Sequence, residues 1–197
     1  MIGLFTKNVD DVWFGVACGE KRVYGTAFAT NQKAVLKSLL DCVPFDVPFE
    51  AFSKPSPFAE KVISTIKRAY DGKGVSEDFQ LAAESLTSYN RQVLEVCAKI
   101  PLGYVASYGA VAKAAGGSAR SVGTVMAGNP FAPIIPCHRV VRSDFGLGGY
   151  GGGLAVKREM LNREKRGHKT KRDVRVGNKK LGVFPVEMVL KQLKKKK

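Results

Sequence analysis

The stretch that decides the fold is "SYGAVAKAAGGSARSVGTVMAGNP", residues 107–130. Ser107 and Ser118 each stand directly before a run of helix-forming residues, and serine is a preferred residue at a helix N-cap. A glycine pair separates the two runs, and "NP" ends the second. Two short helices joined by a glycine turn form the outline of a helix-turn-helix, although other helical hairpins share it.

The second of these expected helices is covered largely by small side chains. Such a face lets the backbone of a ligand come close, and it equally suits close packing against a neighbouring helix, so both interpretations stay open. Arg120 stands at the start of the helix, where an outward arginine suits contact with phosphate or stacked bases. The small residues are Ala119, Ser121, Gly123, Thr124 and Ala127.

The chain before residue 76 predicts a small α/β unit. Residues 12–30 alternate as two strands of a hairpin, and helices are expected over 32–41 and 57–72. Nothing in this part indicates catalysis. We therefore predict a two-domain α/β (α+β) fold. Its parts are a small N-terminal α/β scaffold domain with a hairpin or sheet plus helices over 1–75, a linker over 76–84, a mostly helical C-terminal domain with the helix-turn-helix over 85–168, and a basic extension over 169–197.

The net charge of +15 is concentrated near the C-terminus. From Lys157 to the last residue there are 16 basic and 4 acidic residues, a local net charge of +12. This excess favours a polyanionic partner, most simply nucleic acid, against the alternative of a solvated tail. The sequence has no apolar run long enough for a membrane span and no secretory signal, so we expect a cytoplasmic protein, or a nuclear one in a eukaryote.

Four cysteines and two histidines limit the metal chemistry that the chain can support. No CxxC pair occurs, and a four-ligand zinc site is poorly supplied, so we expect no metal and no cofactor. Cys18 and Cys42 either form a disulfide or, as is usual in a reducing compartment, remain free thiols. The remaining cysteines are Cys97 and Cys137.

The stretch "PCHRVV", residues 136–141, places a cysteine beside a histidine. A thiol with a pKa near 8.5 needs a nearby base to become a good nucleophile. Neighbours on an extended segment point to opposite faces, so His138 would act on Cys137 through a water or a bend, with Glu164 as the group that orients the imidazole. Pro133 and Pro136 predict a stiff segment exposed on one side at each proline. The alternative is a buried core thiol.

These residues together resemble the O6-alkylguanine-DNA alkyltransferases (methylated-DNA–protein-cysteine methyltransferases). The resemblance covers about residues 84–167 and rests on "RQVL" at 91–94, "SYG" at 107–109, "GNP" at 128–130, "PCHRVV" and "GGLAVK" at 152–157. It implies a monomer that binds double-stranded DNA from the minor groove and flips an O6-alkylguanine out of the stack. The alkyl group would pass to a cysteine and stay there, so that each protein molecule reacts once.

The resemblance also implies a role for each matching residue. Cys137 would be the alkyl acceptor, His138 its base through a water, and Glu164 the group that orients His138. Asn129 would support the turn that carries the cysteine. Arg120 would fill the gap left by the flipped base, and Tyr108 would push on the phosphate and protonate the guanine. The other DNA contacts implied are Met126, Ala119, Gly123, Asn90 and Ser143, and the alkylguanine pocket would comprise Val140, Tyr150, Gly151, Gly152 and Lys157.

Two positions depart from the family pattern. Gly151 stands where many relatives carry serine, which removes a side-chain donor to the guanine oxygen. Ala127 replaces a basic residue, which removes a phosphate contact. We expect the basic extension to add phosphate contacts. Two alternatives remain: a cysteine hydrolase that uses Cys137, His138 and Glu164, and a DNA-binding module without catalysis.

Overall fold

The computed structural model describes residues 1–75 and 77–195 and contains two compact units. The first unit comprises 1–70, 74–86 and 130–134, and the second comprises 71–73, 87–129 and the chain from 135 onward. Each unit therefore includes a short segment that is distant in the chain from the rest of it: 130–134 in the first unit and 71–73 in the second. The domains expected from the sequence are each one continuous segment of the chain. Their limits stay a prediction.

A five-stranded sheet in the order β4-β1-β2-β3-β5 forms the centre of the first unit. Strands β1, β2 and β3 are antiparallel neighbours, and the expected hairpin is confirmed as β2 and β3. Strand β1 was not predicted, and neither were the short edge strands β4 and β5, which pair in parallel with β1 and β3. The strands are β1 (Ile2–Val9), β2 (Val12–Cys18), β3 (Arg22–Ala29), β4 (Phe49–Phe52) and β5 (Gln80–Leu81).

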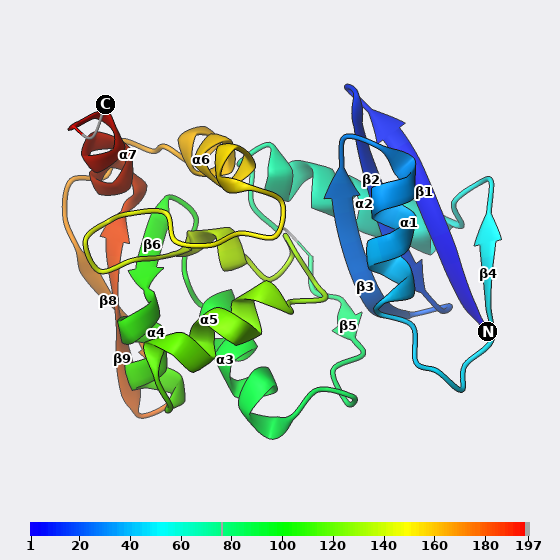
Figure 1. Ribbon diagram of the computed structural model, residues 1–197, viewed down its shortest axis with the longest axis horizontal. Helices are drawn as coiled ribbons and strands as arrows, with labels where there is room; N and C mark the ends of the chain where they lie inside the picture. The colour runs from blue at the N-terminus through cyan, green and yellow to red at the C-terminus, as the bar shows by residue number, and fades with distance from the viewer. Residues whose placement is uncertain (76, 196–197) are drawn as a thin grey trace. The chain divides into compact units, whose positions relative to one another are not determined.

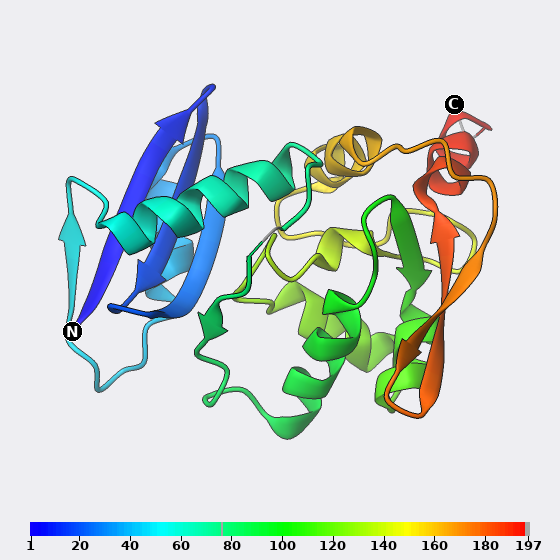
Figure 2. The same cartoon turned by 180° about the vertical axis from the view of Figure 1, so that it is seen from behind.

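Helices α1 (Gln32–Leu40) and α2 (Pro57–Tyr70) cover opposite faces of this sheet (Figures 1 and 2). The sequence offers Asn31 and Ser56 as the caps of these two helices, because each directly precedes the expected helix. The side chain of Asn31 accepts a hydrogen bond from the backbone N–H of Ala34, and the hydroxyl of Ser56 accepts one from Ala59. These bonds satisfy N–H groups that a helix start leaves unpaired.

The second unit combines helices with a four-stranded sheet in the order β7-β6-β9-β8. The sequence offers Thr87 or Ser88 as the cap of the first helix of this unit, and Ser107 and Ser118 as the caps of the next two. Thr87, Ser107 and Ser118 each accept a hydrogen bond from the backbone N–H three residues on, so they are the caps. The elements are α3 (Ser88–Ala98), β6 (Tyr104–Ser107), α4 (Tyr108–Ala115), α5 (Ala119–Ala127), the 3-10 helix η1 (Cys137–Arg139), β7 (Val140–Val141), α6 (Leu154–Arg163), β8 (Arg172–Val176), β9 (Lys179–Pro185) and α7 (Val186–Lys195).

The basic extension is part of the second unit's core. Strand β9 pairs antiparallel with both β6 and β8 (Figure 1). Residues at alternate positions of β9 and at helical spacing in α7 are fully buried, so the segment folds as a hairpin and an amphipathic helix. The sequence suggested a helix over 183–193, but the structure starts it at Val186, because the three residues before it belong to β9. The buried residues are Leu181, Val183, Val186 and Val189.

The expectation that the segment before Cys137 is exposed at its prolines is wrong. Pro133 and Pro136 are both buried. The stretch 130–134 packs against β3, where Thr26 donates its backbone N–H to the carbonyl of Pro130. The hydroxyl of the same threonine donates to the carbonyl of Ala132. These two hydrogen bonds hold residues 130–132 against β3, which the proline spacing alone does not reveal.

Within the described residues, no helix is long and apolar enough to cross a membrane. Cys18, Cys42, Cys97 and Cys137 are all free thiols.

Candidate active site

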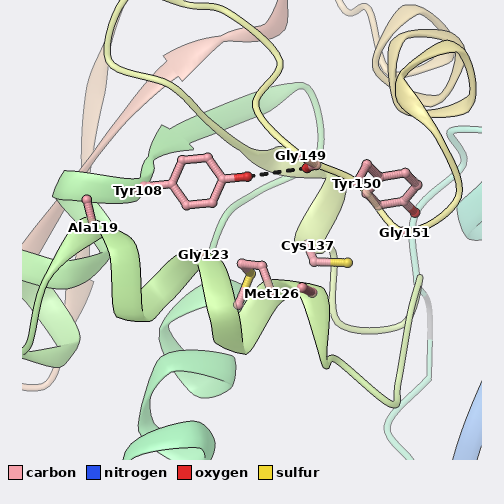
Figure 3. Close-up of a pocket in the computed structure, with 9 residues that line it drawn as sticks. Tyr108, Ala119, Gly123, Met126, Cys137, Gly149, Tyr150 and Gly151 are labelled. Atoms are coloured by element: carbon pink, nitrogen blue, oxygen red, sulfur yellow. Dashed lines mark hydrogen bonds between the residues drawn. The ribbon is translucent and has the colours of Figure 1, made fainter.

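A cavity of about 490 Å³ in the second unit contains the cysteine of "PCHRVV" in its wall (Figure 3). Helix α5 supplies one side through its small residues, and the glycine-rich loop before α6 supplies another. Because small side chains line the helix at this point, space remains beside Cys137. The lining residues are Tyr108, Ala119, Gly123, Met126, Ala127, Cys137, Gly149, Tyr150 and Gly151.

Cys137 opens the short helix η1 and is only 5% exposed. Its backbone N–H donates to the carbonyl of Ile135, which also accepts from the side-chain amide of Asn129 at 2.9 Å. Asn129 thereby ties the end of α5 to the turn that carries the cysteine. Burial raises the pKa of the Cys137 thiol, and the opposing effects of Asn129 and Lys157 do not cancel it. The thiol is therefore protonated near neutral pH and needs a base before it can react.

Behind the cysteine lies a buried cluster of three ionisable side chains. Nε2 of His138 lies 2.8 Å from Oε1 of Glu164, and Arg139 donates to both oxygens of the same carboxylate at 2.9–3.1 Å. A further guanidinium N–H of Arg139 donates to the carbonyl of Ile100 at 2.7 Å. Planar arginine matches a carboxylate in this forked arrangement. We call His138, Arg139 and Glu164 the buried charge cluster.

The protonation states of the cluster follow from its contacts. Burial alone would raise the pKa of Glu164, but His138 and Arg139 outweigh it and lower the pKa to about 2. Burial lowers the pKa of His138 below its usual 6.5, despite the attraction of Glu164. At neutral pH the imidazole is therefore neutral, and its Nε2–H donates to an ionised Glu164. Nδ1 is then an acceptor, and it is buried without a hydrogen-bond partner among the described residues.

Cys137 and His138 lie in a 3-10 turn, so of the two alternatives that the sequence left open, a water or a bend, the bend is present. The argument from opposite faces of a strand therefore does not apply to them. Among the described residues the two side chains still form no direct hydrogen bond, so a bridging group between them remains part of the hypothesis.

Arg139 was not among the candidate residues, although it holds two oxygens of Glu164. The sequence feature that could have identified Arg139 as a site residue is its position directly after His138 in "PCHRVV". An arginine that is only 7% exposed needs compensating partners, and here they are the carboxylate of Glu164 and the carbonyl of Ile100. The sequence does not reveal that burial, so it did not identify the arginine.

Lys157 connects the glycine-rich loop to β7. It is fully buried, and its Nζ donates to the carbonyls of Val140 at 2.7 Å and Gly149 at 3.2 Å. Burial lowers its pKa to about 8. The same Nζ lies 5.7 Å from the ring centroid of Tyr108, whose hydroxyl donates to the carbonyl of Gly149 at 3.4 Å (Figure 3). Lys157 thus fixes the loop that borders the cavity.

The other candidate residues lie outside the cavity wall. Arg120 is exposed at the start of α5, and Ser143 is exposed after β7. Asn90 is half-buried in the first turn of α3. Val140 is fully buried in β7, where it pairs with β6. Gly152, Val140 and Lys157 are not among the lining residues, so their place in a base pocket stays a prediction.

Comparison with known proteins supplies an independent line of evidence. Residues 88–166 match the model of the 6-O-methylguanine DNA methyltransferase, DNA binding domain. A methylated-DNA–protein-cysteine methyltransferase of Thermococcus kodakarensis is 34% identical over 158 residues, which are 78% of this chain and 88% of that protein. The chain belongs to the family of methylated-DNA–protein-cysteine methyltransferases.

Two further proteins are similar to this chain. The Methanothermobacter thermautotrophicus protein of the same name is 42% identical over 113 residues, 57% of this chain, and the match spans less than two thirds of that protein, 64%. A crystal structure of Mycobacterium tuberculosis OGT in complex with DNA has a TM-score of 0.66 and 25% identity, and the likeness covers 83% of this chain and 92% of that one. The family model ends at residue 166, before β8, β9 and α7.

Within the described residues, no group of three or more histidine, cysteine, aspartate or glutamate side chains is arranged to hold a metal ion.

Proposed function

We propose that this protein repairs DNA directly, by irreversible transfer of an alkyl group, typically methyl, from O6 of guanine to Sγ of Cys137. Each molecule acts once. The observation that carries the proposal is the position of Cys137, which lies in the wall of the cavity beside the small face of α5 and adjoins the buried charge cluster. That combination supports a role for Cys137 as a nucleophile in the cavity wall, with the imidazole of His138 buried next to it in the chain.

The cavity suits a base that has left the DNA stack. Its volume of about 490 Å³ falls within the range of roughly 300–1,000 Å³ usual for small-molecule sites. An atom inside a duplex cannot reach a cysteine in such a cavity, so the target guanine must flip out. Ala119, Gly123 and Met126 would then face the minor groove along α5, and exposed Arg120 would occupy the gap left in the stack. Asn90 and Ser143 would contact the backbone.

The cluster would activate the thiol through His138. Ionised Glu164 accepts the Nε2–H, which leaves Nδ1 as the site that receives the thiol proton through a bridging water. The resulting imidazolium is stabilised by the carboxylate beside it. Arg139 holds that carboxylate in place from its other side. The thiolate attacks the alkyl carbon in line with the bond to O6, so the S–C bond forms as the C–O bond breaks.

The guanine that leaves needs a proton. Burial raises the pKa of Tyr108, which keeps its hydroxyl protonated as a donor at the cavity. Tyr108 would donate to guanine N3 and recover a proton that originates from the thiol, so that atoms and charge balance. The products are an S-alkylcysteine and unmodified guanine. Tyr150, Gly151, Gly152 and Val140 would surround the base, while Lys157 holds the loop.

The match to a DNA-binding domain model supports DNA as the partner. The alkylated base, a monomeric state and a cytoplasmic location are part of the proposal, and the free thiols fit a reducing compartment. No cofactor enters the reaction as proposed.

The test is the mass of the intact protein after incubation with excess O6-methylguanine duplex. A single gain of one methyl group per protein, abolished in Cys137→Ala and retained in Cys42→Ala, supports the proposal. Cys42 is a suitable control because it is a half-buried free thiol in the other unit. Repeated turnover without an adduct would favour the hydrolase, and DNA binding without an adduct would favour a binding module.

A further inference from the structure

The β8–β9 hairpin carries two positive charges directly opposite one another. The strand register pairs Arg175 with Lys180, and both side chains are exposed. Residues in opposite positions of an antiparallel pair have Cβ atoms about 4.5–5.5 Å apart, and like charges at this spacing destabilise the pair. A hairpin that keeps such a pair retains a repulsion that a neutral residue would remove.

No acidic side chain within residues 1–75 and 77–195 forms an ion pair with either cation. Arg175 donates its Nε to the carbonyl of Gly177 at 3.2 Å, which leaves the forked end of the guanidinium available. Asp173 alternates onto the same face of the hairpin but pairs with Gly182 rather than with a cation. An anion bound from solution would relieve the repulsion, and a phosphate fits a guanidinium and an ammonium together.

The hairpin also borders a basic groove of about 710 Å³ in the second unit. Lys99, Arg175 and Lys179 line this groove, with Glu95 as the opposing acid. Three cations against one carboxylate make the groove attractive to an anion. The remaining lining residues are Gln92, Val96, Ala114, Val176, Gly177 and Asn178.

Two contacts connect the elements that border this groove to α4 and to the first turn of α5. Nζ of Lys179 donates to the carbonyl of Ala114, the second-last residue of α4. The hydroxyl of Tyr89, on the same helix as Gln92, donates to the carbonyl of Gly116 and bonds Ser121 of α5. Helix α5 has nine residues and is therefore about 13.5 Å long. The groove therefore borders α4, the helix that directly precedes α5 in the chain.

We propose that the β8–β9 hairpin, with Lys99 across the groove, binds the phosphodiester backbone of the same DNA duplex that α5 engages. A duplex presents one charge per roughly 1.7 Å of its axis, so a strand that passes α5 brings several phosphates to the hairpin. The hairpin lies beyond the segment matched by the family model. The inference rests on the proposed function only for the position of the duplex along α5.

The test is the salt dependence of binding to undamaged duplex DNA. Each phosphate contact contributes about 0.9 to the slope of log affinity against log salt. In Arg175→Gln/Lys180→Gln the slope should fall by about 1.8. Between 50 and 200 mM salt, wild-type protein should therefore lose about 12-fold more affinity than this variant does. Lys33→Gln/Lys37→Gln, which neutralises two exposed lysines of α1, is the matched control and should keep the wild-type slope.

A reaction that needs no DNA separates this proposal from the proposed function. Uptake of the alkyl group from free O6-benzylguanine needs the cavity and Cys137 but no phosphate, so the hairpin variant should react at the wild-type rate. An unchanged slope in the hairpin variant overturns the proposal, as does an equal fall in the α1 control. A fall seen with duplex RNA but absent with duplex DNA also overturns it. Because binding is measured on undamaged DNA, failure of alkyl transfer would contradict the proposed function alone.

Discussion

The second unit holds charge in two contrasting ways. In the buried charge cluster, Arg139 and His138 share the carboxylate of Glu164, and no side chain of the three is more than 9% exposed. On the hairpin, Arg175 and Lys180 stand opposite one another in solvent without an acid between them. Inside the protein these charges need compensating partners, because an uncompensated buried charge is expensive. Solvent tolerates an unbalanced pair, which keeps it available to a polyanion.

The largest effect in this comparison should come from Glu164→Gln. The change leaves the buried Arg139 without its carboxylate and His138 without the acceptor that orients it. Breaking a buried pair on one side costs about 3–5 kcal/mol, so the free energy of unfolding should fall by that amount. Urea unfolding at pH 7 measures it, and the rate of methyl uptake should fall in parallel.

The matched control for this variant is Glu159→Gln. Glu159 pairs with Arg163 across one turn of α6, and its side chain is 52% exposed. Surface pairs contribute about 0–1 kcal/mol, so the control should lie close to wild type. If the two variants lose equal stability, burial is not what makes the cluster important.

Acid should weaken the cluster without any mutation. The pKa of Glu164 in the folded protein, about 2, lies below its ordinary value of 4.5. Its contribution is therefore complete above pH 4.5 and is lost as the pH falls through that window towards 2. At 1.36 kcal/mol per unit the contribution is about 3 kcal/mol. The pKa of His138 is also lowered, so its contribution declines as the pH falls below 6.5.

Urea unfolding of wild type and Glu164→Gln at pH 7, 5 and 3 separates this effect from the titration of other carboxylates. The difference between the two proteins should stay constant from pH 7 to 5 and shrink towards pH 3. A difference that keeps its full size at pH 3 would contradict the low pKa assigned to Glu164.

The smallest effect, with opposite sign, should come from Arg175→Gln/Lys180→Gln. Removing like charges from opposite positions should raise stability by about 0.2–1 kcal/mol, because the repulsion disappears. Thermal unfolding at low salt measures the gain, which should diminish as salt screens the charges. A loss of stability would mean that the two side chains support the hairpin, and the contrast with the cluster would then fail.

The location of the basic extension also changes how its role is tested. Deletion of residues 169–197 would remove β8, β9 and α7 and expose the core that Leu181 and Val183 help to fill. Its effect on DNA affinity would then reflect unfolding as much as lost charge. Substitutions on the exposed face of the hairpin avoid this, because those side chains lie outside the core.

Local signals in the sequence predicted many features of this fold. The serine caps of α4 and α5, the glycine turn between them and the cap of α1 were all readable, because each depends on residues within one helical turn. Strand β1 was missed, although its partner β2 was found. The pairing of β9 with β6 was also missed, because it joins residues about 80 positions apart in the chain.

The sequence by itself determined the chemistry available to this protein. It supplied one cysteine beside one histidine, a small-faced helix and a strongly basic C-terminal part, and its motifs indicated the family. The tertiary structure decided which partners those groups have. It folded Cys137 and His138 into a turn, brought Arg139 onto Glu164 and folded the extension into a hairpin and a helix, with Arg175 and Lys180 left exposed. The physical reason is that capping and side-chain chemistry act over a few residues, whereas burial and strand register depend on segments far apart along the chain.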